Sequence, residues 1–303
     1  MNFFRGILGK ILFPVIVMTT ILVALTVVVS MYTFSQFAEQ VFDKDIHVFA
    51  ECLNYDITLQ RTIAADQVNS IAKSALMIAA LKEQDQAKIS DIITRFQSEQ
   101  KCTFFTILDA NANVIYRTND PTKFGDSQTY LRSVREALVQ QETRIYYESI
   151  YYESTLLSPV SIRAAVPVFD ENGTVIGAVT GGFRLDSDAW VDHVQKLYGV
   201  ECTVFAGEER VATTVKNPET GKRAIGTPLD NPKVHEVVFK KKETYFGECK
   251  VLGKPMKAFY KPLHNDGDDK VFGMLFIGIP RQMQIDAEHR SMPCGNLALT
   301  RIV

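Results

Sequence analysis

The stretches SIRAAVPVFDENGTVIGAVTGGFRL (residues 161–185) and MKAFYKPLHNDGDDKVFGMLFIGIP (residues 256–280) decide the fold. In each, two runs rich in β-branched and aromatic residues flank a turn of Asn, Asp and Gly, which is the pattern of a β-hairpin. A second hairpin pattern precedes each of them, TFFTILDANANVIYRT at residues 103–118 and ECTVFAGEERVATTV at residues 201–215. The chain therefore repeats one β-rich unit.

Landmark residues of the two copies lie 95 to 101 residues apart, so a single adjustment of loop length aligns them. Such internal similarity is strong evidence about a fold. We predict an α+β protein with two tandem modules, each a five-stranded antiparallel sheet with helices beside it. Short helices are expected over Leu131–Val139 and from the capping residue Ser187 to Gly199. The aligned landmarks are Gly125 with Gly226, Pro167 with Pro262, Gly177 with Gly273, and Gly182 with Gly278.

A long helix is expected before the first module. Between Ser35 and Gln100 there is neither Gly nor Pro, and apolar residues recur at steps of three and four with one break, at Gln60 and Arg61. We predict a helix over Ser35–Leu81 and a second over Asp85–Gln97. A helix of that length needs a partner along part of its face, so we expect self-association. The apolar positions are Phe42, Ile46, Phe49, Leu53, Ile57, Ala64, Val68, Ile71, Ala75 and Ile78.

An uncharged segment, Ile11 to Met31, is long enough to cross the roughly 30 Å hydrocarbon core of a bilayer. Arg5 and Lys10 precede it, whereas the first charges after it are acidic. This asymmetry places the N-terminus in the cytoplasm and the remaining chain outside. A cleavable signal peptide is the alternative, but its apolar core is shorter and ends at a small-x-small site. We therefore expect an uncleaved anchor.

Composition excludes several classes of function. The 303 residues carry a net charge of −2, which gives no excess of positive charge for binding nucleic acid. There is no nucleophile elbow, H-E-x-x-H motif, phosphate-binding loop or dinucleotide fingerprint, so we expect neither an enzyme nor a cofactor. The five His and five Cys residues lack metal-ligand spacing, and the cysteines are interpreted as small buried hydrophobic residues rather than a disulfide framework.

The residues from Ser35 to Pro280 resemble the extracytoplasmic double Cache (PAS-like) sensor region of bacterial methyl-accepting chemotaxis proteins. The stretches that carry the resemblance are AAVPVFDENGTVIGAVTGG, TVFAGEERVATTV, GKRAIGTPLD and VFGMLFIGIP, in this order after an anchor and a long helix. The resemblance implies a ligand-binding, non-catalytic sensor that works in signal transduction. It also implies a homodimer formed through the long N-terminal helix, in a single-pass protein of the bacterial inner membrane with the sensor outside or in the periplasm.

The resemblance divides the chain into six parts. The sequence departs from the family after the second module, where no second span or signalling helices follow, so we expect a receptor truncated before its second transmembrane helix. The parts are a cytoplasmic N-terminus (1–10), a transmembrane helix (11–32), the long and second helices (33–98), a membrane-distal Cache module (99–189), a membrane-proximal Cache module (190–281) and an aberrant C-terminal tail (282–303).

The resemblance also suggests where a ligand binds. Single Cache sensors of organic acids, which the chain resembles at IYRTNDPTKFGD and SIRAAVPVFDENG, place arginines on two strands to hold a carboxylate. A guanidinium group suits this role because its fork gives two charge-assisted hydrogen bonds to one carboxylate. The usual His after the first arginine is absent, and Asn119 stands near its place. The ligand-binding candidates are Arg163, Arg117, Tyr146, Arg132, Tyr130 and Asp186.

Several alternatives stay open. Each arginine can be a solvated surface residue, and the tyrosines near Tyr146 can build a core or a dimer contact. In the second module the equivalent candidates are ranked lower; they are Arg210, Thr213, Arg223 and Tyr260. The expected ligand is a small polar metabolite, a carboxylate or an amino acid. The output can instead be that of a histidine kinase or diguanylate cyclase receptor, or the chain can be a ligand-free periplasmic interaction module.

Overall fold

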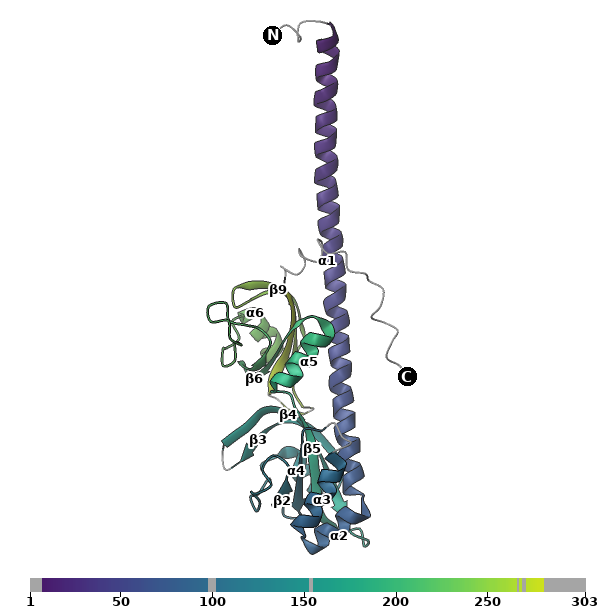
Figure 1. Cartoon of the computed structure of the whole chain (residues 1–303), viewed down its shortest axis with the longest axis vertical. Helices are drawn as coiled ribbons and strands as arrows, with labels where there is room; N and C mark the ends of the chain where they lie inside the picture. The colour runs from purple at the N-terminus through teal and green to yellow at the C-terminus, as the bar shows by residue number, and fades with distance from the viewer. Residues whose placement is uncertain (1–6, 98–101, 153–154, 266, 269–270, 281–303) are drawn as a thin grey trace. The chain divides into compact units, whose positions relative to one another are not determined.

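A computed structural model describes residues 7–97, 102–152, 155–265, 267–268 and 271–280. It contains two separate five-stranded antiparallel sheets, with strand orders β2-β1-β5-β4-β3 and β7-β6-β10-β9-β8 (Figure 1). The predicted α+β architecture with two modules is confirmed, and we call them the first and the second module. The expected tail over residues 282–303 lies outside the described residues.

The N-terminal helix α1 (Ile7–Ala72) includes the apolar segment Leu12–Phe34, which has the length and hydropathy of a membrane span and is not buried by the rest of the chain. Farther along α1, Leu53, Ile57, Ala64 and Val68 are all buried, as the stripe of apolar residues predicts.

The prediction of one helix up to Leu81 is wrong, because α1 ends at Ala72 and α2 (Ala75–Glu83) begins after Ser74. Ser74 adopts an extended backbone, with φ −66° and ψ 128°. The break changes which side chains face the core: Met77 is buried, whereas Ala75 is exposed. The second predicted helix is confirmed as α3 (Gln86–Gln97).

The first sheet separates two environments within its module. One face packs on α1, α2 and α3 through a continuous apolar cluster that includes Val68, Met77, Phe105 and Val179. On the other face lies α4, close to the predicted Leu131–Val139 helix. The elements are β1 (Phe104–Asp109), β2 (Val114–Arg117), α4 (Arg132–Gln140), β3 (Arg144–Tyr152), β4 (Thr155–Phe169) and β5 (Val175–Arg184).

The second module begins with α5 (Asp188–Tyr198), where the Ser187 side chain accepts a hydrogen bond from Trp190 N and Gly199 ends the helix in the left-handed conformation, as predicted. Its remaining elements are β6 (Glu201–Ala206), β7 (Glu209–Thr213), α6 (Pro232–His235) continued by the π-helical turn η2 (Glu236–Lys240), β8 (Tyr245–Val251), β9 (Lys254–Leu263) and β10 (Gly273–Pro280).

The register of the strands confirms the duplication. Gly177 and Gly273 each pair with the last residue of the first strand of their sheet. A Cβ atom at these positions would lie 2.3 Å from Leu108 O and 2.0 Å from Phe205 O, so only glycine fits. The other landmarks also keep equivalent partners in the two sheets: Pro167 with Pro262, Gly182 with Gly278, and Gly125 with Gly226.

A loop of the second module docks on β3 of the first. The side chain of Asn265 accepts a hydrogen bond from Tyr147 N (2.7 Å) and donates one to Tyr147 O (3.1 Å), as a neighbouring strand would. Asn265 also donates to Asp268, whose carboxylate accepts a hydrogen bond from Arg132 Nη1 at 2.5 Å. The two modules are therefore joined by buried, directional contacts at β3 and α4.

The same junction explains why the apolar stripe of α1 is interrupted. Arg61 donates a hydrogen bond to Ile145 O (3.2 Å), and its guanidinium group lies 5.1 Å from the centre of the Tyr147 ring. About two turns earlier, Asn54 accepts a hydrogen bond from Lys261 Nζ of β9 (2.7 Å). The polar break therefore lies where the helix passes from one module to the other.

Replacing Asn265 by alanine should weaken this junction. Asn265→Ala leaves the backbone N–H and C=O of Tyr147 without the side chain that pairs both, and we expect the free energy of unfolding to fall by about 1–3 kcal/mol. Amide hydrogen exchange at Tyr147 should accelerate, whereas Asn172→Ala in an exposed turn should change neither quantity. Unchanged exchange at Tyr147 would show that the junction does not protect β3.

Candidate functional site

Strand register gathers a polar group of residues on the α4 side of the first sheet. Residues that pair directly across antiparallel strands share a face, as do residues two apart along a strand. Arg117 pairs with Thr106, Thr106 with Thr180, and Arg163 with both Gly182 and Tyr146. The residues on this face, which we call the arginine face, are Thr106, Arg117, Tyr146, Glu148, Ser161, Arg163 and Thr180.

Arg163 lies at the centre of the arginine face and is 1% exposed. Its Nη1 donates a hydrogen bond to Thr180 Oγ1 at 2.8 Å, and its guanidinium group lies 4.8 Å from the centre of the Phe104 ring. Among the described residues, Arg163 Nε has no hydrogen-bond acceptor, and it lies 3.7 Å from Glu148 Oε2. Arg117 Nε and Arg210 Nε also lack an acceptor among the described residues, so it is the combination of this donor with a facing buried acid that distinguishes Arg163.

Glu148 is the acid that faces Arg163, and it is 6% exposed. Its carboxylate accepts two hydrogen bonds from Ser133 at the start of α4, one from the backbone N and one from Oγ, both at 2.7 Å. The side chain of Ser161 donates to Glu148 O at 2.6 Å. Glu148 therefore joins α4, β3 and β4 at one buried point.

Arg117 is the second buried arginine of the arginine face and is 2% exposed. It forms an ion pair with Asp126, which lies in the loop after β2 and keeps partial access to solvent. The register of β2, β1, β5 and β4 places Arg117 and Arg163 on one face.

Burial is the largest influence on the pKa values of Arg163 and Glu148, which we call the central pair. Burial lowers the pKa of Arg163 and Arg117 lowers it further, whereas Glu148 and Tyr130 act in the opposite direction. Burial also raises the pKa of Glu148, although Arg163 and the hydrogen bonds from Ser133 favour its ionised form. Both groups are thus less readily charged than in water, because desolvation outweighs their mutual attraction.

The other candidates occupy different places. The guanidinium group of Arg132 lies 4.4 Å from the centre of the Tyr146 ring. It donates hydrogen bonds to Glu136 (2.6 Å) and Asp268, so Arg132 and Tyr146 lie together at the edge of the arginine face. Tyr146 donates a hydrogen bond to Glu136 at 2.6 Å. Tyr130 is 48% exposed in the loop before α4, near Arg163.

Asp186 is not brought to this group. It lies beyond the end of β5, where its carboxylate forms an ion pair with Arg184 at 3.1 Å.

The equivalent face of the second module is filled by bulky side chains. By register, Thr213 replaces Arg117 and Ala258 replaces Arg163. Phe276 takes the place of Thr180, and Cys249 that of Glu148. Tyr260, two residues after Ala258, packs at 4.8 Å from Phe276 and at 6.1 Å from Tyr245, between ring centres.

The remaining second-module candidates have structural partners. Arg210 is buried and its Nη1 donates to Thr227 Oγ1 (2.9 Å) and Pro228 O (2.6 Å). Arg223 binds both oxygens of Asp192 on α5, at 2.7 and 2.8 Å. Arg210 lies near Tyr260 and Cys249, but among the described residues neither arginine faces a buried acid as Arg163 does.

Family models match both modules. A "Single cache domain 3" model matches residues 56–189, and a second model of the same description matches residues 184–290. The chain belongs to the Cache family. Its two Cache modules follow each other in tandem, as the resemblance implied.

Curated relatives of the Cache modules are sensor kinases. The chain is 27% identical over 131 residues to "Sensor histidine kinase DpiB" of Escherichia coli (strain K12). The matched residues make up 43% of this chain and 22% of that protein. It is 29% identical over 136 residues to "Sensor histidine kinase CitA" of Klebsiella pneumoniae, covering 45% and 23%. The matched part is thus less than a quarter of the length of these relatives.

Among solved structures, the chain is similar to "Methyl-accepting Chemotaxis protein X", with a TM-score of 0.51 and 13% identity over 80% of this chain and 99% of the other. At this identity the similarity concerns the fold alone.

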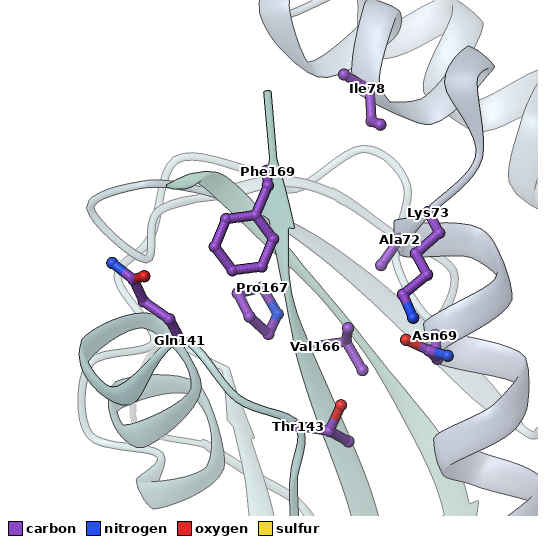
Figure 2. Close-up of a pocket in the computed structure, with 9 residues that line it drawn as sticks. All are labelled: Asn69, Ala72, Lys73, Ile78, Gln141, Thr143, Val166, Pro167 and Phe169. Atoms are coloured by element: carbon purple, nitrogen blue, oxygen red, sulfur yellow. The ribbon is translucent and has the colours of Figure 1, made fainter. Parts of the chain in front are cut away.

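A groove of about 380 Å³ lies elsewhere in the first Cache module, between the end of α1, α2 and the last residues of β4 (Figure 2). Figure 2 shows Val166, Pro167 and Phe169 along β4, with Asn69 and Lys73 on the α1 side. The groove has mainly apolar walls and one lysine, and it lacks the buried, paired charges of the arginine face. We therefore place the candidate site at the arginine face.

Sequence reasoning missed Glu148, Thr180 and Ser133. Their signal is strand alternation: in RIYYESIYY, Glu148 lies two residues after Tyr146 and so on the same face. Thr180 is detectable only once β5 is paired with β4, because a threonine within an apolar strand is common.

A double-mutant cycle measures the coupling of the central pair. Arg163→Met leaves Glu148 buried without its opposite charge, and we expect a loss of about 3–5 kcal/mol in the free energy of unfolding. Arg163→Met with Glu148→Gln should lose less than the sum of the single changes, by about 0.5–3 kcal/mol. The same cycle on Glu248, which is exposed, and Lys257, which is half-buried opposite it, should give nearly additive values in chemical denaturation. Additivity at Arg163 and Glu148 would contradict their coupling.

Proposed function

We propose that the first Cache module binds a small organic anion through Arg163, with Arg117 supplying a second positive charge. The proposal rests on one observation: the buried pair of Arg163 and Glu148 in the first module has no counterpart in the second, where Ala258 and Cys249 stand at the two positions. Arg163 Nε, without an acceptor among the described residues, is available to a carboxylate oxygen. A carboxylate or an amino acid is the ligand chemistry that fits best.

The second Cache module has a supporting role in this proposal. Phe276 stands at the position of Thr180 and packs on Tyr260, and Ala258 stands at the position of Arg163. Its interior resembles a packed core, and its loop at Asn265 and Asp268 holds the first module at β3 and α4.

We further propose that the modules face outward from a bacterial inner membrane, with the helix Leu12–Phe34 as anchor and the N-terminus in the cytoplasm. The apolar segment and the preceding Arg5 and Lys10 support this orientation. The proposed receptor class is a chemoreceptor. A histidine kinase is the second candidate, because both curated relatives are sensor kinases. The coding region that follows the Val303 codon would distinguish long heptad helices from a kinase domain.

A homodimer through α1 is part of the proposal. Opposite the buried stripe of α1, Cys52, Tyr55 and Leu59 recur at steps of three and four, and Tyr55 is 71% exposed. This spacing is typical of a seam between two helices.

A carboxylate screen tests ligand binding. We expect at least one of acetate, lactate, succinate, malate and citrate to raise the melting temperature of the full chain in detergent, because a ligand that binds only the folded state stabilises it. Arg163→Lys keeps the charge but loses the fork, and should weaken binding by about tenfold or more. Arg210→Lys, at a buried arginine of the second module, is the matched control and should leave the ligand-induced shift intact. A shift lost only in Arg210→Lys would move the site to the second module.

Cross-linking tests the dimer. In a chain carrying Cys294→Ser, mild oxidation should give a covalent dimer through Cys52, because the other three described cysteines are buried. With Cys52→Ser added, Tyr55→Cys should restore the cross-link, whereas Thr58→Cys, an exposed position away from the Cys52, Tyr55 and Leu59 stripe, should not. Equal cross-linking at both positions would exclude a specific seam.

A further inference from the structure

Glu148 is placed as a resident counter-ion rather than as a contact for a ligand. Both carboxylate oxygens are already held by Ser133, through its N and Oγ at 2.7 Å, and the side chain is 6% exposed. It faces Arg163, whose Nε lies 3.7 Å from Glu148 Oε2, a distance of an ion pair but too long for a hydrogen bond. The arginine is thus neutralised without having its Nε–H satisfied.

The charges of the arginine face balance when no ligand is present. Arg117 is paired with Asp126 and Arg163 with Glu148, so the four ionised groups sum to zero. An anion that binds at Arg163 brings a negative charge close to Glu148 within a buried environment. Two carboxylates that share one positive partner favour a state in which one of them is protonated.

We propose that Glu148 competes with the ligand for Arg163 and takes up a proton from solvent when a carboxylate binds there. This inference rests on the proposed function of the first module and adds a regulation of the same site. The proton goes to a Glu148 carboxylate oxygen, and no covalent bond to the ligand forms. Ser133 Oγ, a hydroxyl group, can turn from donor to acceptor and hold the protonated acid, while Ser133 N continues to donate.

Groups around Glu148 support this assignment. From β4 it faces Arg163, and from α4 it faces Ser133 and the backbone of Arg132, whose guanidinium group is held by Glu136 and Asp268. On β3, Tyr146 is bonded to Glu136. Arg117 and Tyr130 also lie near Arg163, and they affect its pKa in opposite directions.

Histidine cannot supply the pH response of the first module, because residues 99–189 contain none. Burial already raises the pKa of Glu148, which brings its titration closer to neutral pH before any ligand arrives. A coupled anion then raises that pKa further. Binding should therefore tighten as the pH falls, up to about tenfold per pH unit where one full proton is taken up.

Calorimetry of the full chain in detergent tests the proposal. Succinate and malate are titrated at about pH 6.5 and about pH 8, where both carboxyl groups of each probe are ionised. Measurements in two non-carboxylate buffers with different heats of ionisation, PIPES and imidazole near the lower pH and HEPES and Tris near the higher pH, separate proton uptake from binding. The wild-type protein should take up a fraction of a proton and bind more tightly at the lower pH.

The decisive variant is Glu148→Gln, which keeps the shape and removes the charge. It should bind the probes about tenfold more tightly near pH 8, with no proton uptake and no pH dependence. Glu142→Gln, the same change at an exposed glutamate of this module, should behave as the wild type. Ser133→Ala removes a hydrogen bond to the ionised acid and should move the proton uptake to higher pH, which gives an answer even if Glu148→Gln does not fold.

The outcomes separate the two proposals. Binding with unchanged affinity and unchanged proton uptake in Glu148→Gln would overturn the role of Glu148 and leave the anion site intact. Weaker binding in that variant would overturn it too, because the acid would then contact the ligand directly. If neither probe bound to the wild type, Glu148→Gln or Ser133→Ala, the proposed anion function would fail for these dicarboxylates and the coupling would fall with it.

Discussion

An arginine and a glutamate buried together on one face of an antiparallel sheet are the constraint on which the first module depends. Arg163 and Glu148 are almost completely excluded from solvent, and their nearest charged atoms lie 3.7 Å apart. Desolvation of two such groups costs more than their attraction returns unless further hydrogen bonds hold them. Thr180 and Ser133 supply those bonds, from β5 and α4. An apolar pair would pack at lower cost, as the second module demonstrates at the same positions with Ala258 and Cys249.

The remaining architecture follows from keeping this face polar while the sheet stays stable. Apolar burial is concentrated on the opposite face, where α1, α2 and α3 cover β1, β4 and β5 through one cluster. The helix break at Ser74 serves that packing, since it turns Met77 into the core. The α4 side has a smaller apolar cluster around Leu108 and Val134, so the charges of the arginine face occupy only part of that side.

Features that arise from the backbone were predictable from the sequence. Gly177 and Gly273 are required by contacts with a neighbouring carbonyl, and Ser187 and Gly199 by the ends of a helix, so each leaves a local signature. Arg163 was recognisable as a charge beside an apolar run, although β4 begins at Thr155 and Arg163 lies in the middle of the strand rather than at its start. The role of Glu148 and the contact of Asn265 with Tyr147 were not recognisable from the sequence, because both depend on which distant segments meet. The helix expected through Leu81 failed for a related reason: tertiary packing changed the phase of a continuous apolar pattern.

Gly177 and Gly273 occupy equivalent positions in the two sheets, which reflects the internal repeat of the chain. The two sheets present the same backbone, with the Arg163 and Glu148 pair in one and Ala258 with Cys249 at the same positions of the other. Because both modules share this backbone, a change of ligand would require different side chains at only a few positions of one sheet. Ligand specificity can therefore change through substitutions on one sheet while the backbone of both modules stays the same.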